Sequence, residues 1–124
     1  MNQHILIVDD DKTFIDYLKS RLSALGYNVT TAGDGKEALE ICKHEHPDFI
    51  VSDLCMPDVD GCDFAKQIKS DAKTKNIYFI MLSAFDNFVS IAKALDYGAD
   101  DYVGKPCDFN ILIGKIRNHK PAHS

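Results

Sequence analysis

The chain has 124 residues, 45% of them hydrophobic, and it carries a formal net charge of −5 with a pI near 5.4. This length suggests one domain, and the apolar content is enough for a core. The acidic balance argues against direct binding to nucleic acid or to an anionic membrane, since both attract basic patches. The first apolar run is short and lacks a basic leader, so we expect no signal peptide and no membrane span.

Strand-like and helix-like segments alternate along the chain. Strands are expected near residues 4–9, 28–32, 48–53, 77–82 and 100–104. Between them apolar residues recur at helical spacing, and Gly26 and Gly98 are expected to end the first and fourth helices. The apolar residues that indicate five helices are Phe14, Leu18, Leu22 and Leu25; Ala38, Leu39 and Cys42; Phe64 and Ile68; Ile91 and Leu95; and Phe109, Leu112, Ile113 and Ile116.

This alternation predicts an α/β fold with a parallel sheet and right-handed crossovers. Five strands favour a doubly wound sheet of order 2-1-3-4-5, which is a flavodoxin-like (βα)5 three-layer sandwich. We expect one domain over residues 1–120, followed by a short polar tail at residues 121–124.

Acidic residues follow two of the apolar strands. Asp9, Asp10 and Asp11 close the first apolar run, and Asp53 closes the run over residues 49–52. In the order 2-1-3-4-5 the winding reverses between strands one and three, and ligands bind outside the carboxyl ends of the strands at that point. The carboxylates of Asp9, Asp10 and Asp53 are therefore expected to converge at one edge of the sheet and to hold a cation.

Two further strand ends, those of the fourth and fifth strands, supply a hydroxyl and an ammonium group. The fourth strand ends at Ser83, and the fifth is followed by Lys105 and Pro106. Mg²⁺ prefers oxygen ligands, and phosphoryl transfer needs mainly positioning and neutralisation of charge. With one carboxylate as nucleophile, this set of side chains indicates phosphoryl chemistry.

Four segments, each at a strand end, together resemble one known family. They span residues 5–11, 53–61, 81–84 and 98–106. The chain resembles the receiver domains of two-component response regulators over about residues 4–118. Ser52 departs from the family pattern, which usually has an aliphatic residue before the acceptor.

The resemblance implies a metal-dependent phosphoacceptor site. Asp53 would accept a phosphoryl group from a phosphohistidine. Asp9 and Asp10 would bind Mg²⁺, with Mn²⁺ as a substitute, and Asp53 and the backbone carbonyl of Cys55 would complete the protein ligands.

The resemblance also implies a switch. Ser83 would hydrogen-bond the phosphoryl group, Lys105 would ion-pair with it, and Tyr102 would turn inward as Ser83 moves. The peptide bond between Lys105 and Pro106 would be cis. Helix four, strand five and helix five would form the output surface.

As partners, the resemblance implies a sensor histidine kinase or a histidine phosphotransfer protein. Downstream it implies a protein target, or a C-terminal effector domain that this sequence lacks, and a homodimer that forms on phosphorylation. Such a domain is cytoplasmic, promotes only its own phosphorylation and dephosphorylation, and is not an enzyme in the usual sense.

Two other functions are weighed against this one. Asp9, Asp11 and Thr13 fit the D-x-D-x-T motif of haloacid-dehalogenase-like phosphatases, with Asp9 as nucleophile and Asp11 as acid/base. That reading leaves residues 53–61 unexplained. A flavin-binding module would need a Ser/Thr/Gly-rich phosphate loop after strand one, where this chain has acids.

Several polar residues also have a plain structural interpretation. Asp11 is read as an exposed cap, and Asp100 and Asp101 as turn and strand-entry residues. Ser83 could be a helix N-cap and Tyr102 a half-buried strand residue. His44 and His46 are read as solvated residues at the end of helix two. The cysteines Cys42, Cys55, Cys62 and Cys107 are interpreted as reduced thiols, in preference to a disulfide pair or to a zinc site of Cys55, Cys62, His44 and His46.

Overall fold

Five parallel strands form one sheet in the order β2-β1-β3-β4-β5, which confirms the predicted fold. The structure is a computed structural model that describes residues 3–53, 61–83, 92, 95, 96, 98–104 and 108–118. Each predicted strand boundary is correct to within one residue. The strands are β1 His4–Val8, β2 Asn28–Ala32, β3 Phe49–Asp53, β4 Tyr78–Ser83 and β5 Asp101–Gly104.

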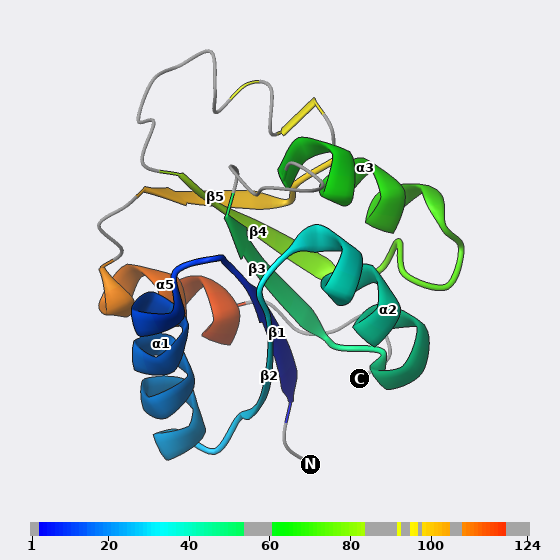
Figure 1. Ribbon diagram of the computed structural model, residues 1–124. Coiled ribbons are helices and arrows are strands. Elements are labelled where there is room, and N and C mark those ends of the chain that lie inside the picture. Colours follow the sequence, from blue (N-terminus) through cyan, green and yellow to red (C-terminus); the bar gives the residue numbers. More distant parts are fainter. Residues whose placement is uncertain are drawn as a thin grey trace.

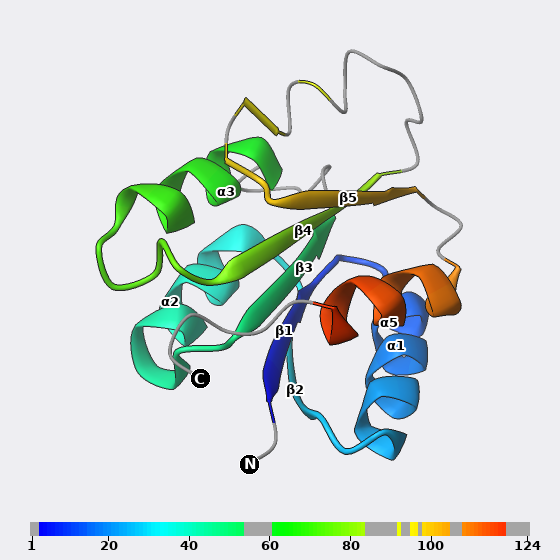
Figure 2. The ribbon, with the colours of Figure 1, turned by 180° about the vertical axis from the view of Figure 1, so that it is seen from behind.

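Helices cover both faces of the sheet. Helices α2 (Gly35–Glu45) and α3 (Gly61–Ser70) lie on one face, and α1 (Lys12–Ala24) and α5 (Phe109–Arg117) lie on the other (Figure 1). The view from behind shows the same three layers (Figure 2). The fourth predicted helix, around residues 91–95, falls largely outside the described residues.

Aspartates begin three of the helices. The side chains of Asp11, Asp34 and Asp108 each accept a hydrogen bond from a backbone N–H in the first turn of α1, α2 and α5. Such caps satisfy backbone donors that have no partner within the helix. Gly26 follows α1 with φ of 96°, a left-handed conformation that glycine adopts without a steric penalty, so the predicted stop is confirmed.

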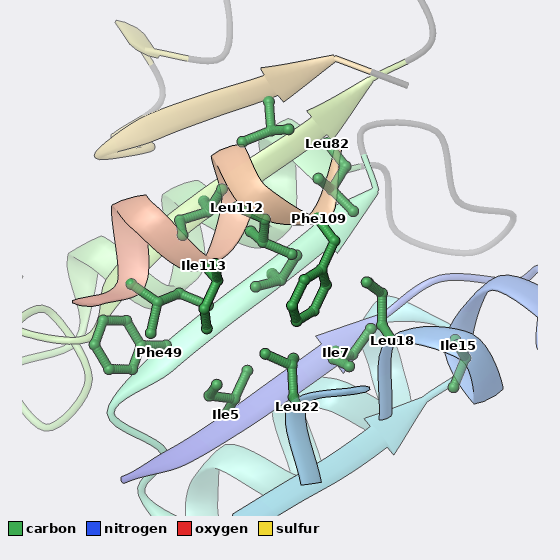
Figure 3. Close-up of a cluster of buried hydrophobic side chains, with 14 residues drawn as sticks. Ile5, Ile7, Ile15, Leu18, Leu22, Phe49, Leu82, Phe109, Leu112 and Ile113 are labelled. Atoms are coloured by element: carbon green, nitrogen blue, oxygen red, sulfur yellow. The ribbon is translucent and has the colours of Figure 1, made fainter. Parts of the chain in front are cut away.

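The sheet separates two apolar clusters because successive side chains on a strand point to opposite faces. In β1, Leu6 and Val8 pack on the side of α2 and α3, whereas Ile5 and Ile7 pack on the side of α1 and α5. Figure 3 shows the second cluster, in which Leu18 and Leu22 of α1 and Phe109 and Leu112 of α5 meet β1 and β3. Coverage on both faces explains why these strands are almost continuously apolar.

No helix among the described residues is both long and apolar enough to cross a membrane.

Candidate functional site

The register of the parallel strands brings their carboxyl ends to one edge of the sheet. Val8 of β1 pairs with Ser52 of β3, so the residues that follow, Asp9 and Asp53, end neighbouring strands. Further along the edge, Asp53 pairs with Leu82. The site expected from the sequence therefore lies at the reversal of winding between β1 and β3.

Three carboxylates meet at this edge. One oxygen each of Asp9, Asp10 and Asp53 lies within 4.8 Å of the other two, which is the convergence that the sequence predicted. The three side chains differ in exposure, since Asp9 is fully buried, Asp53 is 9% exposed and Asp10 faces solvent. The cluster is thus anchored in the core and open on one side.

The backbone around Asp9 holds its carboxylate in place. The N–H of Asp9 donates to the carbonyl of Ala32 at 3.1 Å, which continues the pairing of β1 with β2. Its Oδ1 accepts a hydrogen bond from the N–H of Asp11 at 2.9 Å. A buried carboxylate is costly unless it has such partners, and these hydrogen bonds fix the position of Asp9 beside the other acids of the cluster.

Asp11 has a different role from its two neighbours. It is exposed, and its Oδ1 accepts a hydrogen bond from the N–H of Phe14 at 3.2 Å as the N-cap of α1. The interpretation of Asp11 as a cap is confirmed. The same turn of chain therefore gives two acids to the cluster and one to the helix.

The donor set suits Mg²⁺. This ion takes oxygen ligands at about 2.1 Å in octahedral geometry, so two ligands on opposite sides lie roughly 4.2 Å apart. The three carboxylate oxygens, all within 4.8 Å of one another, need only a small adjustment to reach such spacing. One or two carboxylates with waters and phosphate oxygens form the usual protein site for Mg²⁺.

Ser52, which precedes Asp53 and departs from the family pattern, is fully buried in β3. Its hydroxyl donates to the backbone carbonyl of Asp53 at 3.2 Å. The hydroxyl thus has a local partner, and a buried serine is accommodated directly before the cluster without an unsatisfied donor.

The other predicted site residues are placed only in part. The backbone of Ser83 ends β4 and pairs with Gly104, the last residue of β5. Tyr102 lies in β5, half-buried against the cluster under α2 and α3, which agrees with a half-buried strand aromatic. Cys55, Lys105, Pro106 and the side chain of Ser83 lie outside the described residues.

Sequence reasoning placed Asp100 and Asp101 at the entry to β5 but missed their partners. Lys69 of α3 lies 2.6 Å from a carboxylate oxygen of Asp100, and Lys115 of α5 lies 2.9 Å from one of Asp101. The first pair spans 31 residues of sequence. Such a separation leaves no local signal, so the pair becomes visible only once the fold is known.

A cavity lies between α2 and α3, away from the acidic cluster. This cavity of about 270 Å³ holds none of the predicted phosphoryl-site residues. Burial raises the pKa of the Cys42 thiol on its wall to about 11, and the nearby Glu45 carboxylate adds to the effect. His44 and His46 are exposed, as predicted.

The fold and the acidic cluster define a doubly wound α/β domain with a carboxylate site at the reversal of winding. The family model of the response regulator receiver domain matches residues 5–117. The chain therefore belongs to the response regulator receiver domain family, as the motifs indicated. Receiver domains of two-component systems typically bind Mg²⁺, are phosphorylated and interact with histidine kinases, and they are generally not enzymes in the usual sense.

Sequence relatives agree with this assignment. The chain is 39% identical over 116 residues to the "Probable transcriptional regulator ycf27" of Porphyridium aerugineum, covering 94% of this chain and 47% of that protein. It is 41% identical over 106 residues to the "Alkaline phosphatase synthesis transcriptional regulatory protein PhoP" of Bacillus subtilis (strain 168), covering 86% of this chain and 43% of the relative. The chain thus spans about half the length of the curated relatives it matches.

Solved structures agree as well. The receiver domain of the Francisella response regulator 1452 superposes with a TM-score of 0.87 at 34% identity, covering 94% of this chain and 95% of that one. The chemotaxis response regulator CheY4 of Vibrio cholerae superposes with a TM-score of 0.89 at 27% identity, covering 95% and 98% of the two chains.

Proposed function

We propose that this receiver domain accepts a phosphoryl group on Asp53 in a Mg²⁺-dependent reaction. The observation that carries the proposal is the cluster of Asp9, Asp10 and Asp53, whose carboxylate oxygens lie within 4.8 Å of one another at the reversal of winding. Asp53 ends β3 between β1 and β4, so a group on its side chain lies beside the ends of both neighbours. The donor is the phosphohistidine of a sensor kinase or of a phosphotransfer protein.

The three carboxylates of the cluster have different roles. Asp9 and Asp10 hold the ion together with Asp53 and the backbone carbonyl of Cys55. Bound Mg²⁺ neutralises phosphoryl oxygens, which otherwise face several negative carboxylates. Asp53 attacks phosphorus through one carboxylate oxygen, the bond from phosphorus to the histidine nitrogen breaks, and the histidine keeps that electron pair.

Two further side chains contact the oxygens of the phosphoryl group. Ser83 donates its hydroxyl to one oxygen and Lys105 places its ammonium beside another. The pairing of Ser83 with Gly104 supports this assignment, because it brings the ends of β4 and β5 to the same edge as Asp53. A cis peptide bond between Lys105 and Pro106 directs the lysine.

The switch follows from the same placement. Ser83 moves toward the phosphoryl group and Tyr102 turns inward, so that the surface of the fourth helix, β5 and α5 changes. Phosphorylation biases an equilibrium between two conformations that exist beforehand. Support comes from the position of Tyr102, which packs at the margin of the core and pairs with Met81 of β4.

The test is incubation of the protein with Mg²⁺ and acetyl phosphate, followed by mass spectrometry of the intact chain. We expect the mass of one phosphoryl group on the wild type and no adduct on Asp53→Asn. Asp11→Asn is the matched control, because asparagine caps a helix as well as aspartate does. The proposal is wrong if the wild type gains no mass or if Asp53→Asn gains as much.

The phosphatase alternative is not supported by the family assignment. It requires Asp11 as acid/base, yet the Asp11 carboxylate accepts from Phe14 N–H in the cap of α1. Incubation with Mg²⁺ and p-nitrophenyl phosphate separates the two readings. Turnover that is lost in Asp9→Asn and kept in Asp53→Asn would favour the phosphatase.

The output belongs to a larger system. Because relatives named as transcriptional regulators are about twice as long, the output is an effector domain joined to residues 1–120 or a separate protein target. Residues 121–124 are proposed as a short polar tail. The system works in the cytoplasm.

Phosphorylation favours a homodimer of this chain that forms through the output surface. Sedimentation with and without beryllofluoride and Mg²⁺ tests the dimer.

A further inference from the structure

The ammonium group of Lys69 is held by three acceptors. Its Nζ lies 2.6 Å from the carbonyl oxygen of Ile77, 2.6 Å from Oδ2 of Asp100 and 3.1 Å from the carbonyl oxygen of Lys75. A lysine has three N–H donors, and each has an acceptor here. The side chain is only 19% exposed, whereas surface lysines usually extend into water.

The contacts of Lys69 join segments that are distant in sequence. Lys69 lies in the last turn of α3, and Ile77 directly precedes β4. Asp100 directly precedes β5, and its Oδ2 also accepts a hydrogen bond from the N–H of Phe79 in β4 at 2.8 Å. The backbone N–H of Asp100 donates to the carbonyl of Phe79 at 2.8 Å. Asp100 is therefore held by both α3 and β4.

Gly98 makes room for the lysine. Its φ is 106°, and a Cβ added there would lie 2.9 Å from Cγ of Lys69 and 3.2 Å from its Cβ. The aliphatic stem of Lys69 thus packs directly against the backbone that leads into β5. Figures 1 and 2 both show β5 beginning beside α3.

Strand β5 needs such an anchor. It has four residues and lies at the edge of the sheet, where only β4 pairs with it. A slip of one residue would move its far end by about 3.3 Å and would turn Tyr102 and Val103 to the opposite faces. Lys105 follows Gly104 directly in the chain, so the register of β5 also sets the point from which the chain continues to Lys105.

We infer that Lys69 is a positioning residue for the phosphoryl site. Through Asp100 it holds the register of β5 on β4. The register in turn sets the placement of Tyr102 and Lys105, which lie further along the chain from Asp100. The inference concerning Lys105 rests on the proposed function, whereas the inference concerning the register does not. A misplacement of 1 Å in a site can cost about a hundredfold in rate.

Two measurements on Lys69→Met, which keeps the stem and removes the ammonium, test the proposal. Hydrogen exchange should show amides of β5 losing protection about tenfold, while amides of β1 and β3 keep theirs. The limiting rate of phosphorylation by acetyl phosphate should fall at least about tenfold. Lys66→Met is the matched control, because Lys66 is exposed on the same helix and should leave both measurements unchanged.

Asp100→Asn gives a second and milder route to the same test. It keeps an oxygen for the Phe79 N–H and weakens the contact with Lys69, so protection of β5 should fall less than in Lys69→Met. The double variant should be no worse than Lys69→Met alone, because the two residues act as one unit. If Lys69→Met weakens all strands equally and the folded variant is phosphorylated at the wild-type rate, Lys69 has only a general stabilising role. Absence of a phosphoryl adduct on the wild type would instead refute the proposed function and leave the exchange result standing.

Discussion

The ammonium of Lys115 in α5 lies 2.9 Å from Oδ1 of Asp101, the first residue of β5. The other oxygen of Asp101 accepts a hydrogen bond from the Tyr78 hydroxyl of β4 at 3.1 Å. One carboxylate therefore connects two strands and a helix. Burial alone would raise the pKa of Asp101, but hydrogen bonds from Lys115 and from the Tyr102 N–H outweigh burial and lower it.

Lys115→Met should destabilise the domain by about 1 kcal/mol at neutral pH, because it removes a partly buried charged partner of Asp101. The pKa of Asp101 is lowered on folding. The stabilisation that its carboxylate gives to the folded state is therefore present above the unfolded pKa of 3.8 and is lost as pH falls through the folded pKa. The difference in the free energy of unfolding between wild type and Lys115→Met should therefore shrink in acid. Urea unfolding at neutral pH and near pH 3 measures both quantities.

Lys12→Met is the control for the loss of a lysine charge beside an aspartate. Lys12 lies 3.9 Å from Asp16, but the two side chains are 89% and 62% exposed, so the loss of this pair should cause no measurable change in the free energy of unfolding. An equal loss of stability in both lysine variants, or a loss in Lys115→Met that does not depend on pH, would contradict the role given to Asp101.

The hydroxyl of Tyr78 should ionise late. Burial, followed by the charge of Asp101, raises the pKa of Tyr78 from 10.0 to about 12. Because the folded pKa is raised, the contribution of this group is complete below pH 10.0 and is lost as pH rises from 10.0 toward 12. An ultraviolet titration of wild type minus Tyr78→Phe should show one tyrosine ionising near 12.

Asp101→Asn tests the cause of this shift. Removal of the carboxylate charge should lower the pKa of Tyr78, although burial keeps it above the value for a free tyrosine. A Tyr78 that ionises near 10.0 in the wild type would show that its hydroxyl is solvated and does not donate to Asp101.

The thiol of Cys42 should react slowly in the native protein. Cys42 is a free, buried cysteine of α2, and burial raises its pKa from 9.0 to about 11. Since the thiolate is the reactive form, both access and ionisation disfavour alkylation near pH 8. Peptide mapping after iodoacetamide treatment should find little label on Cys42 in buffer and full label in urea. Rapid labelling of Cys42 in buffer would show that α2 opens readily.

The sheet and the acidic cluster were predictable because their signals are local. Buried parallel strands read as apolar runs, and acids at the ends of β1 and β3 meet at one edge in any sheet of this order. The alternation of strands and helices predicts a parallel sheet, and the number of strands favours the order 2-1-3-4-5 among doubly wound sheets. The separate role of Asp11 was also readable, because aspartate before a helical pattern is a common N-cap.

The contacts of Lys69 and Lys115 were not predictable in the same way. Both lysines lie in helices where a solvated position is the usual expectation, and their partners are adjacent acids that face opposite sides of the sheet. Only the packing of α3 on one face and α5 on the other brings each lysine to its own aspartate. Long-range pairs of this kind depend on tertiary structure and leave no periodic signal in the sequence.

The guanidinium of Arg21 joins α1 to α5. Its central carbon lies 4.2 Å from the ring centroid of Phe109, and its Nη1 donates to the Tyr17 hydroxyl at 3.0 Å. Arg21→Met keeps much of the stem but loses the charge over the ring, so it should cost about 0.5–1 kcal/mol in urea unfolding. Lys19→Met, at an exposed position of the same helix, should cost less than about 0.5 kcal/mol.

In a double-mutant cycle with Phe109→Leu, the coupling energy should match the loss in Arg21→Met, because the ring is the main partner of the charge. A coupling energy near zero would show that the cost arises from Tyr17 or from helix propensity, and that α1 and α5 are held together by their apolar residues alone.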